Sequence, residues 1–299
     1  PMLVLTGQGS TKRLHKESHQ IMDVVKMFEP VTKWATTIIH ADNIPEIVRK
    51  AVRIARSEKP GAVLIELPEN IAEDDTLAVP MLPIRFRRSQ AHKETIVDAA
   101  EKICLASRPV ILAGNGCVRK RSAGILRELA ALTGIGVLNT FMAKGALPSN
   151  SEQSLYTIGL GSKDIGTYAI DAADLVICIG FDMVEYHPSL WNAAGEKKII
   201  HIDFTPAEID SDYHPELELV GDVADTLEAL VSELKKSPSF DFDFSQQALT
   251  RKEMAAELDL YRNDVTKGVI KPQKALADVQ QIYAQDGLLL SDVGAHKMW

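Results

Sequence analysis

Pro109-Val-Ile-Leu-Ala-Gly114 runs directly into Asn115-Gly-Cys-Val-Arg119, and this stretch decides how the sequence around it folds. A run of apolar side chains closed by glycine is typical of a buried strand that ends in a tight turn. Apolar residues at helical spacing over 122–133 predict a helix directly after the turn. A strand, a glycine turn and a helix in this order predict one unit of a parallel α/β sheet.

The same pattern recurs along residues 92–236. Apolar runs predict further strands at 136–139, 175–180, 198–203 and 217–221, and helical spacing predicts helices at 94–106, 163–172 and 223–235. Five strands that alternate with helices predict a doubly wound parallel sheet. We therefore take residues 92–236 as a Rossmann-like central domain of the α/β class.

Shorter α/β pieces flank this domain. They are predicted as strand 1–7, helix 42–58 and strand 62–67 within residues 1–72, and as helices 245–262 and 272–284 and strand 288–290 within residues 245–299. Residues 73–91 and 237–244 lack a period and are interpreted as linkers. Neither flanking piece is enough to close a sheet alone, so we expect the chain to be part of a larger protein.

The composition narrows the classes of partner. Among 299 residues, 33 Lys and Arg stand against 41 Asp and Glu, which gives a net charge of −8. Nucleic acid is therefore not expected as a partner, because phosphate binding needs a basic surface; the one dense basic cluster, Arg85-Phe-Arg-Arg88, is typical of a solvated linker. No apolar run reaches the roughly 20 residues of a membrane helix. Three cysteines without a metal-binding spacing predict buried thiols in a cytoplasmic protein.

Two glycine-containing turns could bind an anion. Gly114–Arg119 lies between a strand and a helix, where backbone N–H groups and the helix N-terminus favour phosphate. It lacks the third glycine of the dinucleotide fingerprint, and a tight strand-to-helix turn is the commoner structure. Gly159–Asp164 offers a second pair of glycines, with Lys163 as a nearby cation.

Single polar residues give weaker signals. Asp182 and Asp203 follow two predicted parallel strands, at the edge of the sheet where ligands bind. Either could hold a ribose, although acidic residues at strand ends more often cap the next helix. His15 and His19 are four residues apart, but no third ligand accompanies them, so a metal site is not expected there. Gln20, beside them, is interpreted from the sequence alone as a surface residue.

Several stretches, taken together, carry a family resemblance. In chain order they are His19–Asp23, Phe28–Lys33, Leu67-Pro68, Ala173–Pro188, Trp191-Asn192, His201–Asp203, Glu218–Asp222 and Asp292–His296. Their types and order resemble the acetolactate synthase family of thiamine-diphosphate enzymes, in particular its catabolic branch, which works without FAD. The resemblance covers essentially the whole chain, and the segment 179–191 is its most specific part.

The resemblance implies a protein of three α/β domains. Residues 1–72 would be the C-terminal part of a pyrimidine-binding domain, 92–236 the central domain, and 245–299 the N-terminal part of a diphosphate-binding domain. The implied reaction uses thiamine diphosphate and Mg²⁺ to decarboxylate pyruvate and to condense the product with a second pyruvate to 2-acetolactate. The implied assembly is a homo-oligomer, either a dimer or a tetramer.

The resemblance also implies site residues. Val293, Gly294, Ala295 and His296 fall where the family's loop contacts the diphosphate through main-chain N–H groups. Gln20 resembles a family glutamine that faces the active site across the subunit interface, although each of these residues could instead be structural. The family's catalytic glutamate and its Gly-Asp-Gly metal motif have no match here. We therefore expect no catalytic residue, no metal ligand and no activity from this chain alone.

The flavin expectation rests on one segment. Where FAD-containing relatives carry Arg-Phe-Asp-Asp-Arg, this chain reads Gly180-Phe-Asp-Met-Val-Glu-Tyr186, which implies an enzyme without FAD. An FAD-containing acetohydroxyacid synthase and another thiamine-diphosphate decarboxylase, of the glyoxylate or oxalyl type, stay open as alternatives. A non-catalytic nucleotide-binding module that uses the turns at Gly114 and Gly159 is a third.

Overall fold

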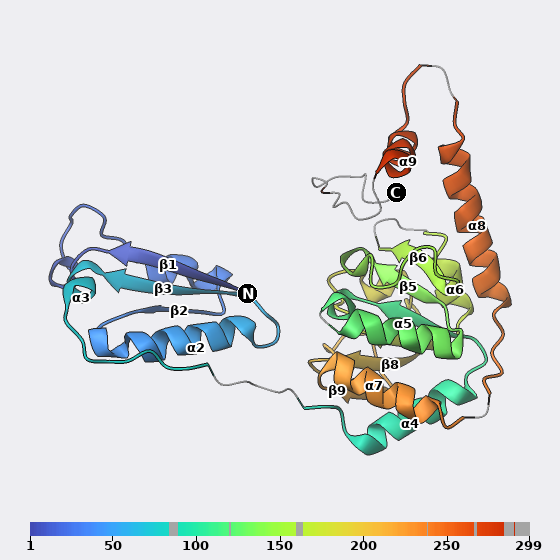
Figure 1. The fold of residues 1–299 in the computed structure, drawn as a ribbon, viewed down its shortest axis with the longest axis horizontal. Coiled ribbons are helices and arrows are strands. Elements are labelled where there is room, and N and C mark those ends of the chain that lie inside the picture. Colours follow the sequence, from blue (N-terminus) through green and yellow to red (C-terminus); the bar gives the residue numbers. More distant parts are fainter. Residues whose placement is uncertain are drawn as a thin grey trace. The chain divides into compact units, whose positions relative to one another are not determined.

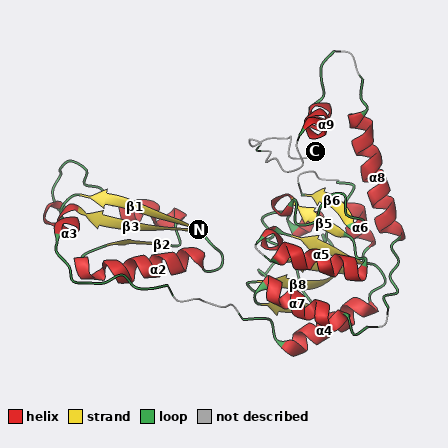
Figure 2. Cartoon of the chain, viewed as in Figure 1, coloured by secondary structure: helices red, strands yellow, loops and turns green. Residues whose placement is uncertain are grey.

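The chain, seen in a computed structural model, forms two compact units, Pro1–Arg87 and Arg88–Trp299, which we call the first and the second unit (Figure 1). The structure describes residues 1–83, 89–119, 121–159, 164–237, 239–265, 268–283 and 290. Each unit combines helices with an all-parallel sheet (Figure 2). The predicted α/β fold class is thereby confirmed.

The first unit contains a three-stranded sheet in the order β1–β3–β2. Its elements are β1 (Met2–Gln8), α1 (Val24–Phe28), β2 (Trp34–Thr37), α2 (Ile44–Arg56), β3 (Ala62–Pro68) and α3 (Glu69–Glu73). Helix α2 covers one face of the sheet, because Ala51 and Ala55 share an apolar cluster with Val63 and Ile65 of β3. Burial of this helix face holds the small sheet together.

Three of these six elements of the first unit were predicted from the sequence, and three were not. The strands predicted at 1–7 and 62–67 and the helix predicted at 42–58 are confirmed to within two residues at each end. Strand β2 was not predicted, because its four residues are all only partly buried and form no apolar run. Helices α1 and α3 have five residues each, which is too short to show a helical period.

The second unit contains a six-stranded sheet in the order β6–β5–β4–β7–β8–β9. Its strands are β4 (Pro109–Ala113), β5 (Val137–Thr140), β6 (Ser154–Ile158), β7 (Leu175–Ile179), β8 (Lys198–Asp203) and β9 (Leu217–Val220). The prediction of five strands is wrong by one, since β6 was missed. This edge strand pairs with β5 through a register shift and holds Tyr156 at φ +65°, so its sequence lacks a regular strand pattern.

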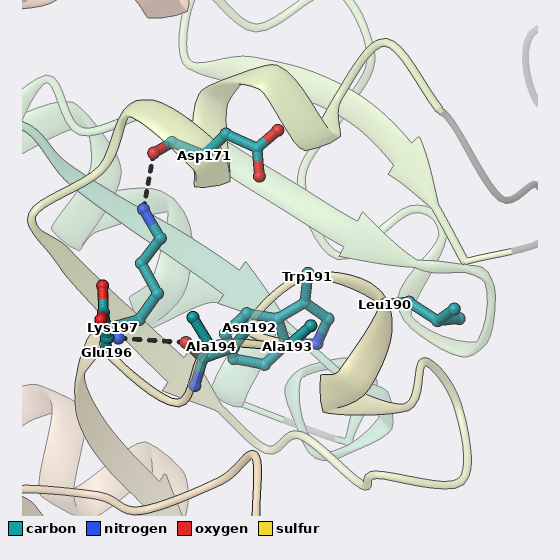
Figure 3. A pocket seen from close by; sticks show the side chains of 8 residues that line it. All are labelled: Asp171, Leu190, Trp191, Asn192, Ala193, Ala194, Glu196 and Lys197. Carbon is teal, nitrogen blue, oxygen red and sulfur yellow. Dashed lines mark hydrogen bonds between the residues drawn. The ribbon is translucent and has the colours of Figure 1, made fainter.

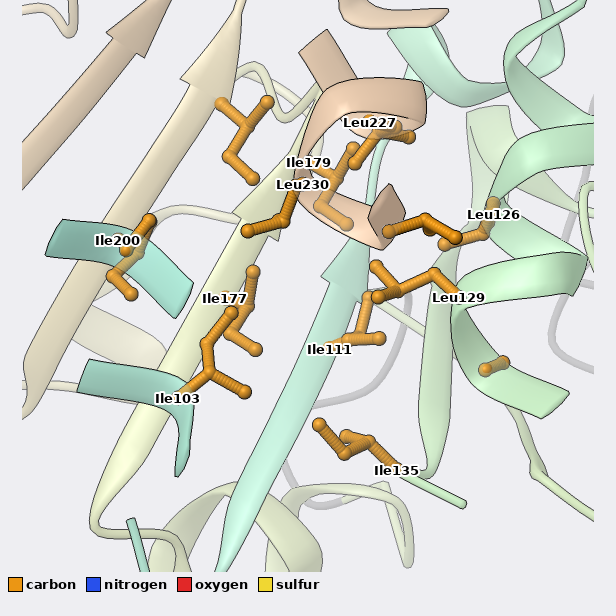
Figure 4. Packing of buried hydrophobic residues seen from close by; sticks show 14 of the residues in the cluster. Ile103, Ile111, Leu126, Leu129, Ile135, Ile177, Ile179, Ile200, Leu227 and Leu230 are labelled. Carbon is orange, nitrogen blue, oxygen red and sulfur yellow. The ribbon is translucent and has the colours of Figure 1, made fainter. Parts of the chain in front are cut away.

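Helices cover both faces of the six-stranded sheet. Helices α4 (Lys93–Leu105), α5 (Ser122–Thr133) and α7 (Val223–Leu234) pack on one face, and α6 (Thr167–Ala172) packs on the other with α8 (Ser245–Arg262) beside it. In Figure 4, Ile111, Ile177 and Ile200 of three neighbouring strands face Leu129 of α5 and Leu230 of α7. Alternate residues of the same strands belong to a second apolar cluster on the opposite face. The predicted doubly wound arrangement is therefore confirmed.

Helix α8 is tied to the sheet of the second unit by one buried side chain. Gln247 Oε1 accepts a hydrogen bond from Gly136 N at 2.8 Å, and its Nε2 donates one to Pro109 O at 2.7 Å. Helix α9 (Pro272–Ile282) begins at its proline as predicted, whereas only Leu290 of the predicted strand 288–290 is described. The domain boundaries at 72, 91, 236 and 244 stay predictions. None of the described helices is long and apolar enough to cross a membrane.

Candidate functional site

The predicted ligand-binding edge of the second unit lies where β4 and β7 end side by side. The chain moves outward from β4 to β5 and β6 and then returns to β7 on the other side of β4. Ligands of open α/β sheets bind at such a reversal, outside the carboxyl ends of the strands. The segments Gly114–Arg119 and Gly180–Tyr186 leave the sheet at this point.

Three glycines let these two segments touch through their backbones. A Cβ atom on Gly114 would lie 2.4 Å from Gly180 O, and one on Gly116 would lie 2.5 Å from Gly180 Cα. Gly180 has φ +57°, a left-handed conformation that favours glycine. The glycines of this turn are therefore required by the packing of two loops of the protein itself.

The backbone N–H groups of the turn donate to acceptors within the protein. Gly114 N and Gly116 N donate to carbonyl oxygens of the β7 segment at 2.9 and 2.8 Å, and Cys117 N closes the turn onto Gly114 O at 2.9 Å. Asn115 N donates to Glu185 Oε1 at 2.9 Å. A phosphate would have to displace these bonds, so the geometry agrees with a tight turn rather than a phosphate-binding turn.

The carboxylate of Glu185 occupies the position that an anionic ligand would take at this edge. The residue is 4% exposed; one carboxylate oxygen accepts the bond from Asn115 N and the other accepts a bond from the hydroxyl of Thr140, at the end of β5. Burial raises the pKa of this carboxyl above its usual 4.5, and the bonds from Thr140 and Asn115 counteract the shift. No local pattern predicts this contact, because Glu185 lies 70 residues from Asn115.

The second glycine turn is described only at its two ends, since residues 160–163, with the predicted cation Lys163, lie outside the described ranges. Gly159 N donates to Asp164 Oδ2 at 2.8 Å. A Cβ atom on Gly159 would lie 3.3 Å from Glu185 O, so this turn packs against the loop of Glu185. Here too a carboxylate of the protein takes a backbone N–H that an anionic ligand would need.

The two aspartates at strand ends cap their own turns. Asp182 Oδ1 accepts a hydrogen bond from the N–H two residues further on at 3.3 Å, and Asp203 Oδ1 accepts one from the next N–H at 2.6 Å. Nearby, the buried His201 places its ring nitrogens 2.9 Å from Tyr213 Oη and 3.1 Å from Thr205 O. These bonds close local turns and cap no helix, since the next helices begin at the caps His187 and Asp222; the predicted helix-capping role of the two aspartates is therefore wrong.

The cysteines of the second unit are not placed for chemistry. Cys117 and Cys178 are buried, and burial raises the pKa of both thiols, to about 12 for Cys178. Cys104 is partly buried, with Sγ 3.2 Å from Ser237 Oγ. Thiols held in the neutral form are poor nucleophiles. The expectation of buried thiols is confirmed for Cys117 and Cys178.

A cavity of about 280 Å³, which the sequence did not indicate, lies beside the C-terminal end of α6 (Figure 3). It is lined by Asp171, Leu190, Trp191, Asn192, Ala193, Ala194, Glu196 and Lys197. Lys197 Nζ donates to Asp171 O at 2.6 Å and to Ala173 O at 2.9 Å, and burial lowers its pKa below the usual 10.5. The ammonium therefore holds the last carbonyl groups of α6, as basic side chains at helix C-termini do.

The carboxyl edge of the first unit contains a buried polar cluster that the sequence reasoning missed. Glu66, which is 4% exposed, accepts a hydrogen bond from Gln8 Nε2 at 2.8 Å and another from Thr37 Oγ1 at 2.6 Å. The three residues belong to β3, β1 and β2, so each strand contributes one side chain. The signal that could have found the cluster is a glutamate within the apolar run of β3.

Gln20 lies in a loop beside this edge. Its side chain is exposed, as predicted, and its backbone has φ +62°, which is uncommon for a residue other than glycine. Gln8 Nε2 also donates to Met22 O at 2.7 Å and thereby ties this loop to β1. The residues predicted to contact a diphosphate lie outside the described ranges: Val293, Gly294, Ala295 and His296. Their role stays a prediction.

The histidine pair near Gln20 has no third candidate metal ligand grouped with it among the described residues. His15 and His19 are both exposed. Within the described ranges, no three His, Cys, Asp or Glu side chains come together as metal ligands would. A structural metal site needs about four such ligands, so this pair has no structural support as a metal-binding motif.

Comparison with known proteins gives one domain match and several relatives. Residues 96–230 match the model of the thiamine pyrophosphate enzyme central domain. An acetolactate synthase of Mycobacterium bovis is 30% identical to this chain over an alignment of 316 residues. The alignment covers all of this chain and 49% of the relative's length. A catabolic acetolactate synthase of Raoultella terrigena is 29% identical over 97% of the chain and 53% of its own length. A glyoxylate carboligase of Escherichia coli O157:H7 is 29% identical over 98% of the chain and 50% of its own length.

The match to the family model falls on the second unit, from within α4 to within α7, and thus contains the whole six-stranded sheet. The chain spans about half the length of the curated relatives that it matches. Residues 96–230 therefore match a thiamine pyrophosphate enzyme central domain, and acetolactate synthases are similar to this chain over its whole sequence.

Proposed function

We propose that the chain is part of an acetolactate synthase of the FAD-independent, catabolic type. The enzyme would decarboxylate pyruvate and condense the product with a second pyruvate to 2-acetolactate, with thiamine diphosphate and Mg²⁺ as cofactors. The observation that carries the proposal is the similarity of about 30% to acetolactate synthases over the full chain, in both units. Thiamine diphosphate, when bound, supplies the electron sink for decarboxylation.

The absence of flavin is part of the proposal, and the geometry of the second unit supports it. A dinucleotide would place its phosphates at the turn after β4, where Glu185 and backbone carbonyls already accept the amide hydrogens. Glycines Gly114 and Gly116 face backbone atoms of Gly180, so the turn packs closely against the loop after β7. These residues do not fit the phosphates of FAD.

The described residues have two tasks in the proposed enzyme. The first unit presents Gln20 at the carboxyl edge of its sheet, where a substrate-facing amide could orient a carboxylate or a carbonyl of pyruvate by hydrogen bonding. The second unit provides a rigid core around its six strands. We assign contact with the diphosphate to Val293, Gly294, Ala295 and His296 through their main-chain N–H groups.

We further propose that the 299-residue polypeptide alone forms no acetolactate, and that activity requires a longer polypeptide assembled as a dimer or tetramer in the cytoplasm. The coverage of about half of each relative supports this. Pyruvate is the proposed small-molecule partner. The net charge of −8 argues against nucleic acid, and no membrane partner is proposed.

The test compares two polypeptides with two substrates. The longer polypeptide and the 299-residue chain are each incubated with thiamine diphosphate, Mg²⁺ and either pyruvate or glyoxylate, and the condensation products are quantified. We expect acetolactate from the longer polypeptide only. Substantial turnover by the 299-residue chain would overturn the requirement for more residues.

Glyoxylate carboligation is the second candidate, because the glyoxylate carboligase is as similar to this chain as the catabolic acetolactate synthase, at 29% identity each. A longer polypeptide that prefers glyoxylate to pyruvate at equal concentrations would replace the acetolactate proposal with this one. A preference for pyruvate would exclude it.

A further inference from the structure

The side-chain amide of Gln8 joins the sheet of the first unit to the loop that carries Gln20. Gln8 is the last residue of β1 and is 7% exposed. Its Nε2 donates to Met22 O at 2.7 Å and to Glu66 Oε1 at 2.8 Å, and its Oε1 accepts a bond from Gly9 N at 3.0 Å. Both amide hydrogens and the amide oxygen are therefore engaged, and this fixes the orientation of the group.

Glu66 in turn holds Gln8. It reaches from the central strand β3, is 4% exposed, and accepts a second bond from Thr37 Oγ1 of β2 at 2.6 Å. A hydrogen-bonded chain thus runs across all three strands from Thr37 through Glu66 and Gln8 to the backbone of Met22. Buried and fully paired polar networks of this kind fix one conformation, because any rearrangement leaves a partner unpaired.

The loop packs closely against β1 beside this bond. A Cβ atom on Gly9 would lie 2.4 Å from Ile21 Cδ1, so the residue after Gln8 is small where the loop packs against β1. Met22 O accepts a second bond, from Val24 N at 3.0 Å, at the start of α1. Gln20, next to this fixed segment, has φ +62°. A left-handed conformation costs free energy in a glutamine and persists only where its surroundings impose it.

We propose that Gln8 is a positioning residue, which holds the Ser18–Val24 segment against the sheet and so maintains the left-handed backbone and outward direction of Gln20. The inference rests on the proposed function, in which Gln20 faces the substrate. Gln8 itself is buried beneath the loop and acts on substrate binding only through it. The competing explanation is that Gln8 merely satisfies buried polar groups and has no specific effect on Gln20.

The test uses the 299-residue chain and two local readouts. Amide hydrogen exchange measures the opening of residues 18–24, and the intraresidue HN–Hα nuclear Overhauser effect of Gln20 reports its positive φ. Gln8→Met keeps the size of the side chain and removes its hydrogen bonds. We expect exchange in residues 18–24 to rise about fivefold to tenfold, as for loss of one or two hydrogen bonds, with loss of the positive-φ signal, while the β3 amides at 63–65, next to Glu66, show a smaller rise.

The matched control is Thr32→Val. It removes a side-chain-to-backbone bond of similar length, from Thr32 Oγ1 to Phe28 O at 2.8 Å, in the same unit. We expect this variant to leave exchange in residues 18–24 and the signal of Gln20 unchanged. If Gln8→Met does not fold, Gln8→Asn keeps a buried amide that is too short to reach Met22 O, and the same loosening is expected. Unchanged exchange and an unchanged Gln20 signal in a folded Gln8 variant would overturn the inference.

A kinetic arm separates this inference from the proposed function. In the longer, active polypeptide, Gln20→Ala and Gln8→Met should each lower kcat/KM for pyruvate by about tenfold, and the double variant should lose little more, because both changes act through one group. If Gln8→Met loosens the loop but Gln20→Ala leaves kcat/KM unchanged, the substrate role of Gln20 fails and the positioning role of Gln8 stands. If the effects of the two changes multiply, Gln8 acts by another route and the inference fails.

Discussion

The carboxyl edges of the two sheets differ in the groups that bind their buried glutamate. Each edge contains a buried glutamate that accepts one hydrogen bond at each oxygen, one of them from a threonine hydroxyl: Glu66 with Thr37, and Glu185 with Thr140. In the first unit the other donor is a side chain, Gln8, and the loop above it stays exposed. In the second unit the other donor is a backbone N–H of the glycine turn.

The type of donor bound to the glutamate affects which groups at each edge are available to a ligand. Glu66 lies within a strand and binds Gln8, which ties the loop of Gln20 to the sheet, and Gln20 itself is exposed. Glu185 comes from a loop and takes the amide that a phosphate would need. A carboxyl edge of a parallel sheet is therefore not a site by topology alone, because a carboxylate of the protein can occupy the position of the ligand.

The largest expected effect comes from the glycines that close the second edge. Gly180→Ala should lower the free energy of unfolding of the second unit by about 4 kcal/mol, because the new Cβ combines a left-handed backbone with contacts of 2.5–2.8 Å to backbone atoms. Gly9→Ala, in the first unit, should cost about 1 kcal/mol, since its Cβ meets only the end of a flexible isoleucine. Hydrogen exchange of the strand amides in each unit measures both. Equal losses of stability in Gly180→Ala and Gly9→Ala would show that the two edges do not differ in how tightly their backbones pack.

Removal of the carboxylate at the second edge should have the next largest effect. Glu185→Ala leaves Asn115 N and the Thr140 hydroxyl unpaired and buried, at a cost of about 3 kcal/mol. The control Glu101→Ala, at an exposed position on α4, should change stability by less than about 0.5 kcal/mol. Urea unfolding of each variant, monitored by amide hydrogen exchange in β4 and β7, measures the difference in stability between them. A cost as small as the control's would show that Glu185 does not hold the turn.

The same removal in the first unit should cost less. Glu66→Ala also leaves two donors, but Gln8 Nε2 keeps its bond to Met22 O and Thr37 is only partly buried, so we expect about 2 kcal/mol. Exchange should rise in β1 and in the loop of Gln20, and it should stay constant in the second unit. A cost above that of Glu185→Ala would reverse the proposed ranking of the two edges.

The smallest expected effect is a pH dependence of the second unit. The pKa of Glu185 is raised in the folded protein, chiefly by burial, so the folded state binds this proton more tightly than the unfolded state. Its contribution to stability therefore falls as the pH rises from the usual 4.5 through the folded pKa. Subtracting the stability profile of Glu185→Gln from that of the native chain isolates this contribution. A difference that grows with pH would contradict the assigned direction.

The sequence predicted the parts of this fold that follow a period and missed the parts that do not. Helices such as α5 and α8 match their predicted bounds, because their apolar faces repeat every three to four residues. Strands β2 and β6 were not predicted. Strand β2 has no buried apolar run, and β6 pairs irregularly with β5. Both are short edge strands, where packing against neighbours replaces the local pattern.

The candidate sites show the same limit. The glycine turn at Gly114–Arg119 was visible in the sequence, but its partner was not, since Glu185 approaches it from 70 residues away. The bond between Gln8 and Glu66 spans 58 residues. The family resemblance predicts Gln20 near a substrate, and the structure adds the bond from Gln8 to Met22 O in the same loop. Contacts between distant loops leave no period in a sequence.

The most direct test of the contrast between the two edges is calorimetric titration of FAD into the 299-residue chain, with ADP and NAD titrated separately. Because the amides of the glycine turn are engaged by Glu185 and by the β7 segment, we predict no saturable heat for any of the three up to about 1 mM. Saturable binding of any of them, with amide chemical-shift changes centred on residues 115–117, would place a nucleotide at the turn after β4. That result would contradict the closed edge and favour a nucleotide-binding central domain.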